Sequence, residues 1–126
     1  MSVVGIGTDI VEIKRIADMS DKTRDKLAQR VLTKIEYARY ISINQPERFL
    51  AKRWAGKEAA AKALGTGIAG GVSFQHFYIK SLTSGQPVLE LSDTALEIAK
   101  SLSAVQWHIT LSDEVHYATA FVVLSK

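Results

Sequence analysis

Four charged side chains near the middle of the chain have types and spacing that suit a polyphosphate site. Arg53, Lys57, Glu58 and Lys62 lie within ten residues of one another. On a helix, Glu58 and Lys62 share one stripe, while Arg53 and Lys57 share the adjacent one. Bases neutralise phosphate oxygens, and a carboxylate can bind a hard cation. On spacing alone, however, a Glu58–Lys62 surface ion pair worth about 0.3–0.5 kcal/mol is the simpler interpretation.

A second candidate carboxylate, Asp9, follows a short apolar run near the N-terminus. It can cap the following helix, or it can serve as a ligand held on a rigid strand. On its position alone, Asp9 is better interpreted as a helix cap than as a ligand. The preceding Gly5-Ile6-Gly7 does not extend into a dinucleotide-binding fingerprint, because Ile10 stands where the third glycine is required.

Other chemical motifs are excluded or weak. The glycine-rich segment 65–71 follows a helix, whose dipole disfavours anions at that end, so Gly65 is first a helix stop. The three histidines lack zinc-site spacing, and there is no Gly-x-Ser-x-Gly. The chain contains no cysteine, which excludes disulfides and thiolate chemistry.

The composition is that of a soluble globular protein. The chain has 126 residues, of which 47% are hydrophobic and 23% are charged, so we expect residues 1–126 to form one domain. No apolar stretch approaches about 20 residues, and no signal peptide is evident. We therefore expect a cytoplasmic protein without membrane contact.

Basic residues concentrate in the window 14–30. It carries six bases and three acids, hence a charge of +3, whereas the remaining charges cancel. This pattern fits docking of an acidic partner, and it fits equally a solvated helix surface of mixed charge. Nucleic acid is disfavoured, because aromatic residues are not interleaved with the bases. The bases are Lys14, Arg15, Lys22, Arg24, Lys26 and Arg30.

The spacing of apolar residues predicts an α+β fold. We expect a strand at residues 3–9, helical structure to about residue 30, and a helix capped by Thr33 that ends near residue 43. A further helix runs from Pro46 to Leu64.

The second half of the chain reads mainly as strands. These cover residues 74–80, 87–91, 107–112 and 117–124, and a helix after Ser92 lies among them. The result is a compact domain with an N-terminal strand and helices followed by a small antiparallel sheet, which the first strand joins.

Two segments together resemble the holo-[acyl-carrier-protein] synthase family of 4′-phosphopantetheinyl transferases. GIGTDIVEI at residues 5–13 resembles its N-terminal G-[IV]-G-x-D-[IL] signature. FLAKRWAGKEAAAKA at residues 49–63 resembles its second signature, R-[FW]-[AC]-x-K-E-[AS]-x-x-K-[AG]. Chain length and element order also agree, so the resemblance covers nearly the whole chain.

The resemblance implies that Asp9 and Glu58 bind Mg²⁺, and it overturns the cap and ion-pair interpretations. It implies transfer of the 4′-phosphopantetheine arm of coenzyme A to a serine of apo-acyl carrier protein, in support of fatty acid biosynthesis. Lys62 would act in catalysis, and Glu58 is the preferred base for the serine. The implied coenzyme A contacts are Arg53, Lys57, Lys62 and Gly65.

The resemblance further implies a homotrimer with active sites between subunits. Lys14, Arg15, Lys22 and Arg24 would then dock the acidic carrier protein. One departure stands out, because many relatives place a histidine near the end of the penultimate strand, where this chain has Asp113. We transfer no role of that histidine to Asp113. A non-catalytic adaptor and a nucleotide pyrophosphatase are the competing hypotheses.

Overall fold

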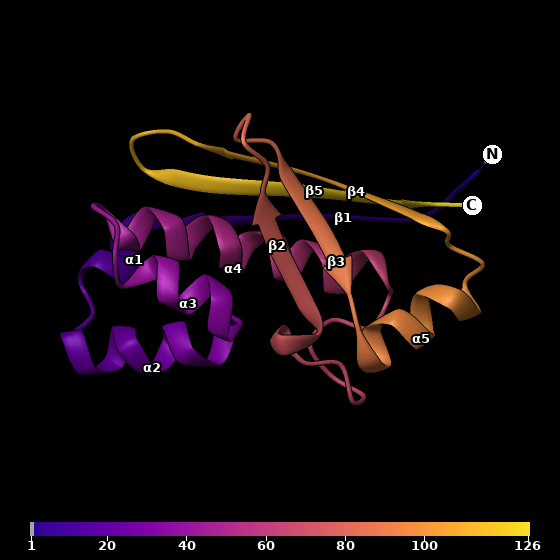
Figure 1. The fold of residues 1–126 in the computed structure, drawn as a ribbon, viewed down its shortest axis with the longest axis horizontal. Helices are drawn as coiled ribbons and strands as arrows, with labels where there is room; N and C mark the ends of the chain where they lie inside the picture. Colours follow the sequence, from indigo (N-terminus) through magenta and orange to yellow (C-terminus); the bar gives the residue numbers. More distant parts are fainter. Residues whose placement is uncertain (1) are drawn as a thin grey trace.

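The computed structural model describes residues 2–126 and arranges its five strands in two antiparallel sheets. β1 (Val3–Glu12), β5 (Tyr117–Ser125) and β4 (Gln106–Asp113) form a three-stranded sheet with β5 in the centre. This sheet lies along α4 (Pro46–Ala63), which runs through the middle of the molecule (Figure 1). The α+β class, the antiparallel pairing and the inclusion of the first strand are confirmed.

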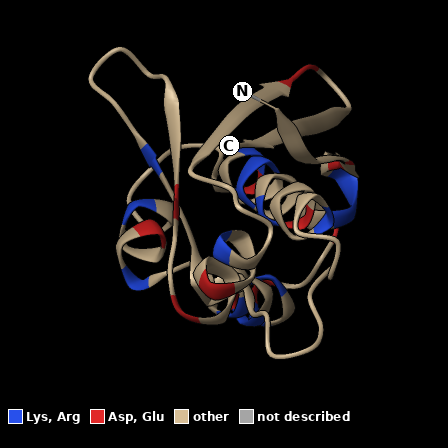
Figure 2. Ribbon diagram, turned by 90° about the vertical axis from the view of Figure 1, so that its right-hand side faces the viewer, with Lys and Arg blue, Asp and Glu red and all other residues tan. Residues whose placement is uncertain are grey.

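The second sheet is a hairpin of β2 (Phe77–Ser81) and β3 (Pro87–Leu91), which crosses α4 and brings β3 close to β4 of the first sheet (Figure 1). The prediction of one sheet is therefore wrong. The strand predicted from residue 74 also starts later, because a 3₁₀ turn, η1 (Phe74–His76), precedes it and is capped by the Ser73 hydroxyl. The hairpin tip projects from the molecule and carries no charged residue (Figure 2).

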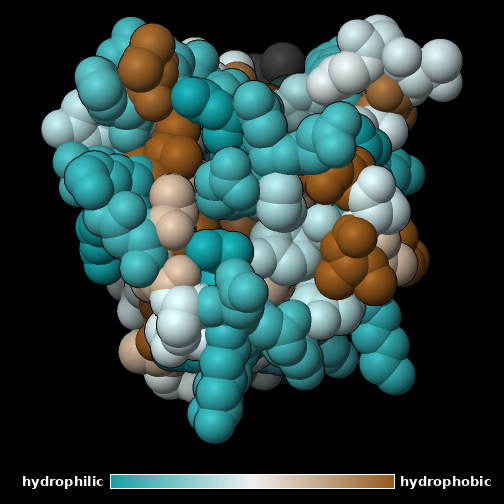
Figure 3. Space-filling model, turned by 90° about the vertical axis from the view of Figure 1, so that its left-hand side faces the viewer, coloured by the Kyte–Doolittle hydropathy of each residue, from teal (hydrophilic) through white to brown (hydrophobic). Residues whose placement is uncertain are grey.

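Three short helices gather at the end of the molecule opposite the chain termini (Figure 1). α1 (Ile13–Ala17) and α2 (Asp21–Val31) are separate because Ser20 caps α2, accepting a hydrogen bond from the Thr23 amide at 3.2 Å. α3 (Lys34–Tyr40) begins at the predicted Thr33 capping box but ends three residues earlier than expected. The surface at this end is mainly hydrophilic, with apolar patches between the polar side chains (Figure 3).

The last helix, α5 (Asp93–Ser101), begins after Ser92 as predicted and buries Ala95 and Ala99, but the Ser92 hydroxyl donates to the carbonyl oxygen of His76 and does not cap the helix. Its apolar stripe therefore appears where the sequence predicted it. No helix within residues 2–126 has both the length and the apolar character needed to cross a membrane.

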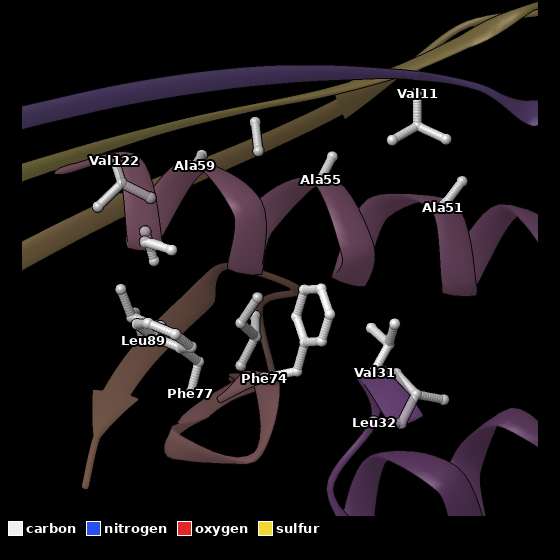
Figure 4. Packing of buried hydrophobic residues seen from close by; sticks show 14 of the residues in the cluster. Val11, Val31, Leu32, Ala51, Ala55, Ala59, Phe74, Phe77, Leu89 and Val122 are labelled. Carbon is white, nitrogen blue, oxygen red and sulfur yellow. The ribbon is translucent and has the colours of Figure 1, made fainter. Parts of the chain in front are cut away.

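The core surrounds α4 on both sides. Ala51, Ala55 and Ala59 point toward the three-stranded sheet, where Val11 and Val122 meet them (Figure 4). Larger side chains fill the opposite side, beneath the helix (Figure 4); they include Val31, Leu32, Phe74, Phe77 and Leu89. Because the sheet-facing side chains are small, β1 can lie almost directly on the helix backbone.

Candidate active site

Two glycines of β1 set the distance between that strand and α4. A Cβ atom added at Gly7 would lie 2.0 Å from the carbonyl oxygen of Ala59, and one added at Gly5 would lie 2.1 Å from that of Ala63. Both distances are far below van der Waals contact, so only glycine allows this approach. The Gly-x-Gly motif therefore serves close backbone packing, and it brings Asp9 to the second half of α4.

Asp9 lies within β1, opposite Ala120 of β5, on the face of the sheet that looks toward α4. The helix cap interpretation is wrong, because β1 continues to Glu12 and the N-cap position of α1 is Glu12. The Asp9 carboxylate is 18% exposed and lies 2.9 Å from the Lys62 ammonium. Lys62 also donates to the carbonyl oxygen of Thr8 at 3.0 Å.

Glu58 completes a cluster with Asp9 and Lys62. Burial, followed by the negative charge of Asp9, raises the pKa of the Glu58 carboxyl group, and the Lys62 charge and hydrogen bonding from Trp54 only partly offset this. The ion pair expected between Glu58 and Lys62 does not form within residues 2–126, because Lys62 turns to Asp9 instead. Two carboxylates and one ammonium thus share a half-buried site.

The donor set of this cluster fits one hard divalent cation. Two carboxylates that repel each other in a half-buried position are stabilised when a cation lies between them. Residues 2–126 contain no group of three His, Cys, Asp or Glu side chains placed to hold a metal. Mg²⁺ suits such a sparse site, because it commonly takes one or two carboxylates and completes its shell with water and substrate phosphates.

Lys57 does not join the cluster, and the prediction that it contacts a phosphate is wrong for this structure. Its side chain is fully buried, and its ammonium donates to Glu36 Oε1 at 2.6 Å and to the carbonyl oxygens of Val31 and Phe74 at 2.7 and 3.3 Å. Burial lowers the pKa of Lys57, and the Glu36 charge opposes that change. All three donors of the ammonium are therefore used inside the protein.

Arg53 lies apart from the cluster, in the wall of a cleft of about 610 Å³. Its guanidinium stacks on Phe49 with 4.5 Å to the ring centre and donates to Ser81 Oγ at 3.1 Å. Burial lowers the pKa of Arg53. Its Nε is buried and has no hydrogen-bond partner within residues 2–126, so the side chain retains an unused donor.

Three further bases line this cleft and escaped the sequence analysis: Arg39, Arg48 and Lys52. The signal was present, because residues 48 and 52 are four apart on the helix that carries Arg53. Asp113 also lines the cleft, and its carboxylate binds Arg48 at 3.0 Å and Lys52 at 3.2 Å. Burial alone would raise the pKa of Asp113, but these two partners outweigh it and the pKa is lowered.

Gly65 ends α4 as predicted. It has a φ of +81°, which favours glycine, and its amide donates to the carbonyl oxygen of Lys62 at 2.9 Å. Gly65 therefore follows the cluster directly along the chain, at the point where the helix opens into the loop of residues 65–71.

The predicted docking residues divide into two groups. Lys14, Arg15 and Lys22 are exposed, and Arg15 lies 5.6 Å from the ring centre of Trp54. Arg24 instead donates to the carbonyl oxygens of Ile16, Ala17 and Met19 at the end of α1. The expectation that Arg24 docks a partner is therefore corrected, since its guanidinium is engaged in joining α1 to α2.

Comparisons with known proteins agree on one family. The model of the 4′-phosphopantetheinyl transferase superfamily matches residues 5–122. The holo-[acyl-carrier-protein] synthase of Shewanella denitrificans is 54% identical over 98% of both chains. The crystal structure of the Neisseria meningitidis holo-[acyl-carrier-protein] synthase has a TM-score of 0.88 and 39% identity, covering 99% of this chain and 100% of that one.

A second solved structure carries a ligand. The holo-(acyl-carrier-protein) synthase of Bacillus anthracis, in complex with CoA (3′,5′-ADP), has a TM-score of 0.80 and 35% identity, covering 97% of this chain and 96% of that chain. The similarity therefore extends over nearly the full length of both proteins.

Proposed function

The chain belongs to the 4′-phosphopantetheinyl transferase superfamily, and we propose that the cluster of Asp9, Glu58 and Lys62 is where its reaction takes place. The protein acts as a holo-[acyl-carrier-protein] synthase. It transfers the 4′-phosphopantetheine group of coenzyme A to a serine of apo-acyl carrier protein and releases adenosine 3′,5′-bisphosphate. The product, holo-acyl carrier protein, supports fatty acid biosynthesis.

One observation carries the assignment of the site: β1 places Asp9 against α4 beside Glu58 and Lys62, although these residues lie about fifty positions apart in sequence. The two carboxylates would hold Mg²⁺. When bound, this ion would neutralise charge on the pyrophosphate of coenzyme A. Transfer of a phosphoryl group depends mainly on such positioning and charge neutralisation.

The side chains of the cluster have distinct roles. The carrier serine oxygen attacks the β-phosphorus of coenzyme A, and the bond from that phosphorus to the oxygen of 3′,5′-ADP breaks. The Glu58 carboxylate takes the serine proton. The Lys62 ammonium, held beside Asp9, stabilises negative charge on the transferring group.

The basic cleft supports a second contact with coenzyme A. Arg53 offers a buried guanidinium with an unused donor, and Arg39, Arg48 and Lys52 add positive charge around it. An anion such as the phosphate of a nucleotide would satisfy the Arg53 Nε. Asp9, Glu58 and Lys62 do not line this cleft. The cleft of one subunit would therefore face the cluster of its neighbour in the homotrimer, with Gly65 near the ligand.

The outer face of the three-stranded sheet supports the homotrimer. Ile6, Ile10, Tyr117 and Phe121 point away from α4 and are between 41% and 61% exposed. Exposed apolar side chains grouped on one face are typical of a protein–protein interface. In this arrangement the sheets of three subunits pack together through these faces.

The basic end of the molecule would dock the carrier. Lys14, Arg15 and Lys22 are exposed there, and the acidic surface of a carrier protein would complement them. The proposed role in fatty acid biosynthesis supports a cytoplasmic location.

One assay tests the function directly. The chain is incubated with coenzyme A, Mg²⁺ and apo-acyl carrier protein, and the carrier is weighed by mass spectrometry. We expect the carrier to gain one 4′-phosphopantetheine group, with adenosine 3′,5′-bisphosphate in the supernatant. An adaptor would leave both molecules intact. A pyrophosphatase would cleave coenzyme A without changing the carrier. Either result would overturn the assignment.

A further inference from the structure

Lys57 precedes Glu58 in the chain, yet its ammonium takes no part in the reaction site. The three acceptors of this ammonium come from three separate segments: the end of α2, the side chain of Glu36 in α3, and η1. Glu36 in turn accepts from the backbone amides of Thr33 and Ile79, each at 2.8 Å. The pair is fully buried, and each of its charges is surrounded by hydrogen-bond partners.

Besides Lys57, α4 makes directional contacts through Arg48 and Lys52 in its first half, through Arg53 to Ser81, and through Lys62 itself. Toward the sheet the helix presents mainly alanines, which pack by shape alone. Val31 and Phe74 lie beneath the helix, on the side away from the sheet (Figure 4). Lys57 points to that side, and Glu58 follows at about 100° around the helix, toward the edge where β1 places Asp9. Of the polar contacts that α4 makes within residues 2–126, those of Lys57 are the fully buried ones, and they lie one residue from Glu58.

We propose that Lys57 is a positioning residue: its buried bonds to Glu36, Val31 and Phe74 fix the rotation of α4 about its axis and so direct Glu58 and Lys62 at Asp9. The lever is short. With side chains reaching about 5 Å from the helix axis, a rotation of about 20° displaces their tips by about 2 Å. A misplacement of about 1 Å can cost on the order of a hundredfold in rate. The inference rests on the proposed function for its kinetic part only.

The test removes both charges together. Lys57→Met alone would leave the Glu36 carboxylate buried and unpaired, which is strongly destabilising and can prevent folding. The double variant Lys57→Met/Glu36→Gln keeps side-chain length at both positions, and the new amide oxygen can still accept from the Ile79 amide. The matched control is Ile98→Ala, which removes apolar packing on α5, an element that contributes no hydrogen-bond partner to the pair.

Two readouts are compared between the double variant and the control. The first is steady-state transfer to the carrier protein, at a temperature where both variants are folded. We expect kcat to fall about tenfold or more, with KM for coenzyme A and for carrier within about twofold of the parent. The control should keep the kcat of the parent.

The second readout needs no substrate. Trp54 shares the helix stripe of Glu58, and the chain has two tryptophans, so Trp107→Phe leaves Trp54 as the sole emitter. We expect its emission maximum to shift in the double variant and to stay unchanged in the control, because rotation of α4 moves Trp54 relative to Arg15. The fluorescence measurement tests the positioning role of Lys57 independently of activity. If the unaltered chain transferred nothing to the carrier, that result would refute the proposed function but not the positioning role.

Three results would overturn the positioning role. One is a kcat that stays at the parent value or follows the control. Another is a raised KM for coenzyme A at unchanged kcat, which would make Lys57 a ligand contact. The third is an unshifted Trp54 emission in the double variant, which would show that α4 has not turned.

Discussion

Glu58 is held in a position that costs stability in the absence of a cation. Its carboxylate is half-buried beside Asp9, and both effects favour the protonated form. Lys62 relieves the charge of Asp9 by direct contact at 2.9 Å, yet Glu58 has no such direct partner among the ion pairs of residues 2–126. A residue whose placement opposes folding but suits a ligand indicates selection for binding.

This arrangement predicts that Glu58→Gln stabilises the metal-free protein. The folded-state pKa lies above the ordinary value of 4.5, so the ionised carboxylate destabilises the fold as pH rises through that raised pKa. Below pH 4.5 both states are protonated, and the two proteins should melt alike. Thermal melts in chelator from pH 4 to pH 8 should therefore show a variant that gains stability over the parent as pH rises. A variant less stable than the parent at pH 8 would contradict the burial and repulsion inferred for Glu58.

Among the packed elements, the contact of β1 with α4 is the tightest constraint on the site. Both Gly5 and Gly7 lie where a methyl group would overlap backbone atoms of the helix. Because those atoms belong to α4 itself, no side-chain rotation can relieve the overlap, and the strand would have to move.

Gly7→Ala should therefore damage both stability and activity. Overpacking of this kind costs about 1–3 kcal/mol, and more where backbone must shift. Asp9 lies two residues further along the same face of the strand, so it should move away from Glu58 and Lys62. Denaturant unfolding and the carrier assay check the two effects. A variant with the parent's unfolding midpoint and transfer rate would show that the strand does not set the geometry of the site.

In the proposed docking of the carrier protein, Arg15 on α1 supplies an exposed charge. Arg15→Glu should raise KM for the carrier several-fold at low ionic strength and leave coenzyme A binding unchanged, because such charges act mainly on association and are screened by salt. The control is Lys100→Glu, which reverses an exposed charge on α5 at the other end of the molecule. If added salt left KM for the carrier unchanged, electrostatic docking at this end would be refuted.

Much of this architecture could be predicted from local sequence. The Thr33 capping box, Pro46 at the start of α4, the Gly65 stop and the alternating pattern of residues 107–112 each act over a few residues. The family signatures also identified Asp9, Glu58 and Lys62, which the structure brings together.

The predictions from sequence were wrong where contacts with distant segments determine the surroundings of a side chain. Lys57 and Lys62 have the same residue type on the same helix, and only the position of Glu36 in the fold makes one buried and leaves the other half-exposed. Arg24 likewise lies on a polar face of its helix. Its guanidinium is engaged only because the end of α1, a separate segment, supplies the carbonyl oxygen that it binds. The cleft around Arg53 combines α3, α4, the hairpin and β4, a combination that no local pattern contains.

We expect the proposed homotrimer in solution, because Ile6, Ile10, Tyr117 and Phe121 are exposed on the outer face of the sheet and the basic cleft and the carboxylate cluster are separate on one chain. Phe121→Asp, near the middle of that face, should yield monomers that have lost transfer activity. Light scattering at micromolar concentration measures the mass of both proteins. A monomeric parent would remove the case for an active site shared between subunits.

The role of Glu58 in transfer is tested most directly by the mass of the carrier protein after reaction with Glu58→Gln. Gln keeps the size and one oxygen of the side chain but loses the charge that a hard cation prefers. Glu97→Gln, on the exposed face of α5, makes the same chemical change away from the cluster. With coenzyme A and sub-millimolar Mg²⁺, we predict that Glu97→Gln modifies the carrier at the parent's rate. Glu58→Gln should be slower by on the order of a hundredfold or more, and Asp9→Asn should match it. Transfer by Glu58→Gln at near the parent's rate would contradict the assignment of this cluster as the active site.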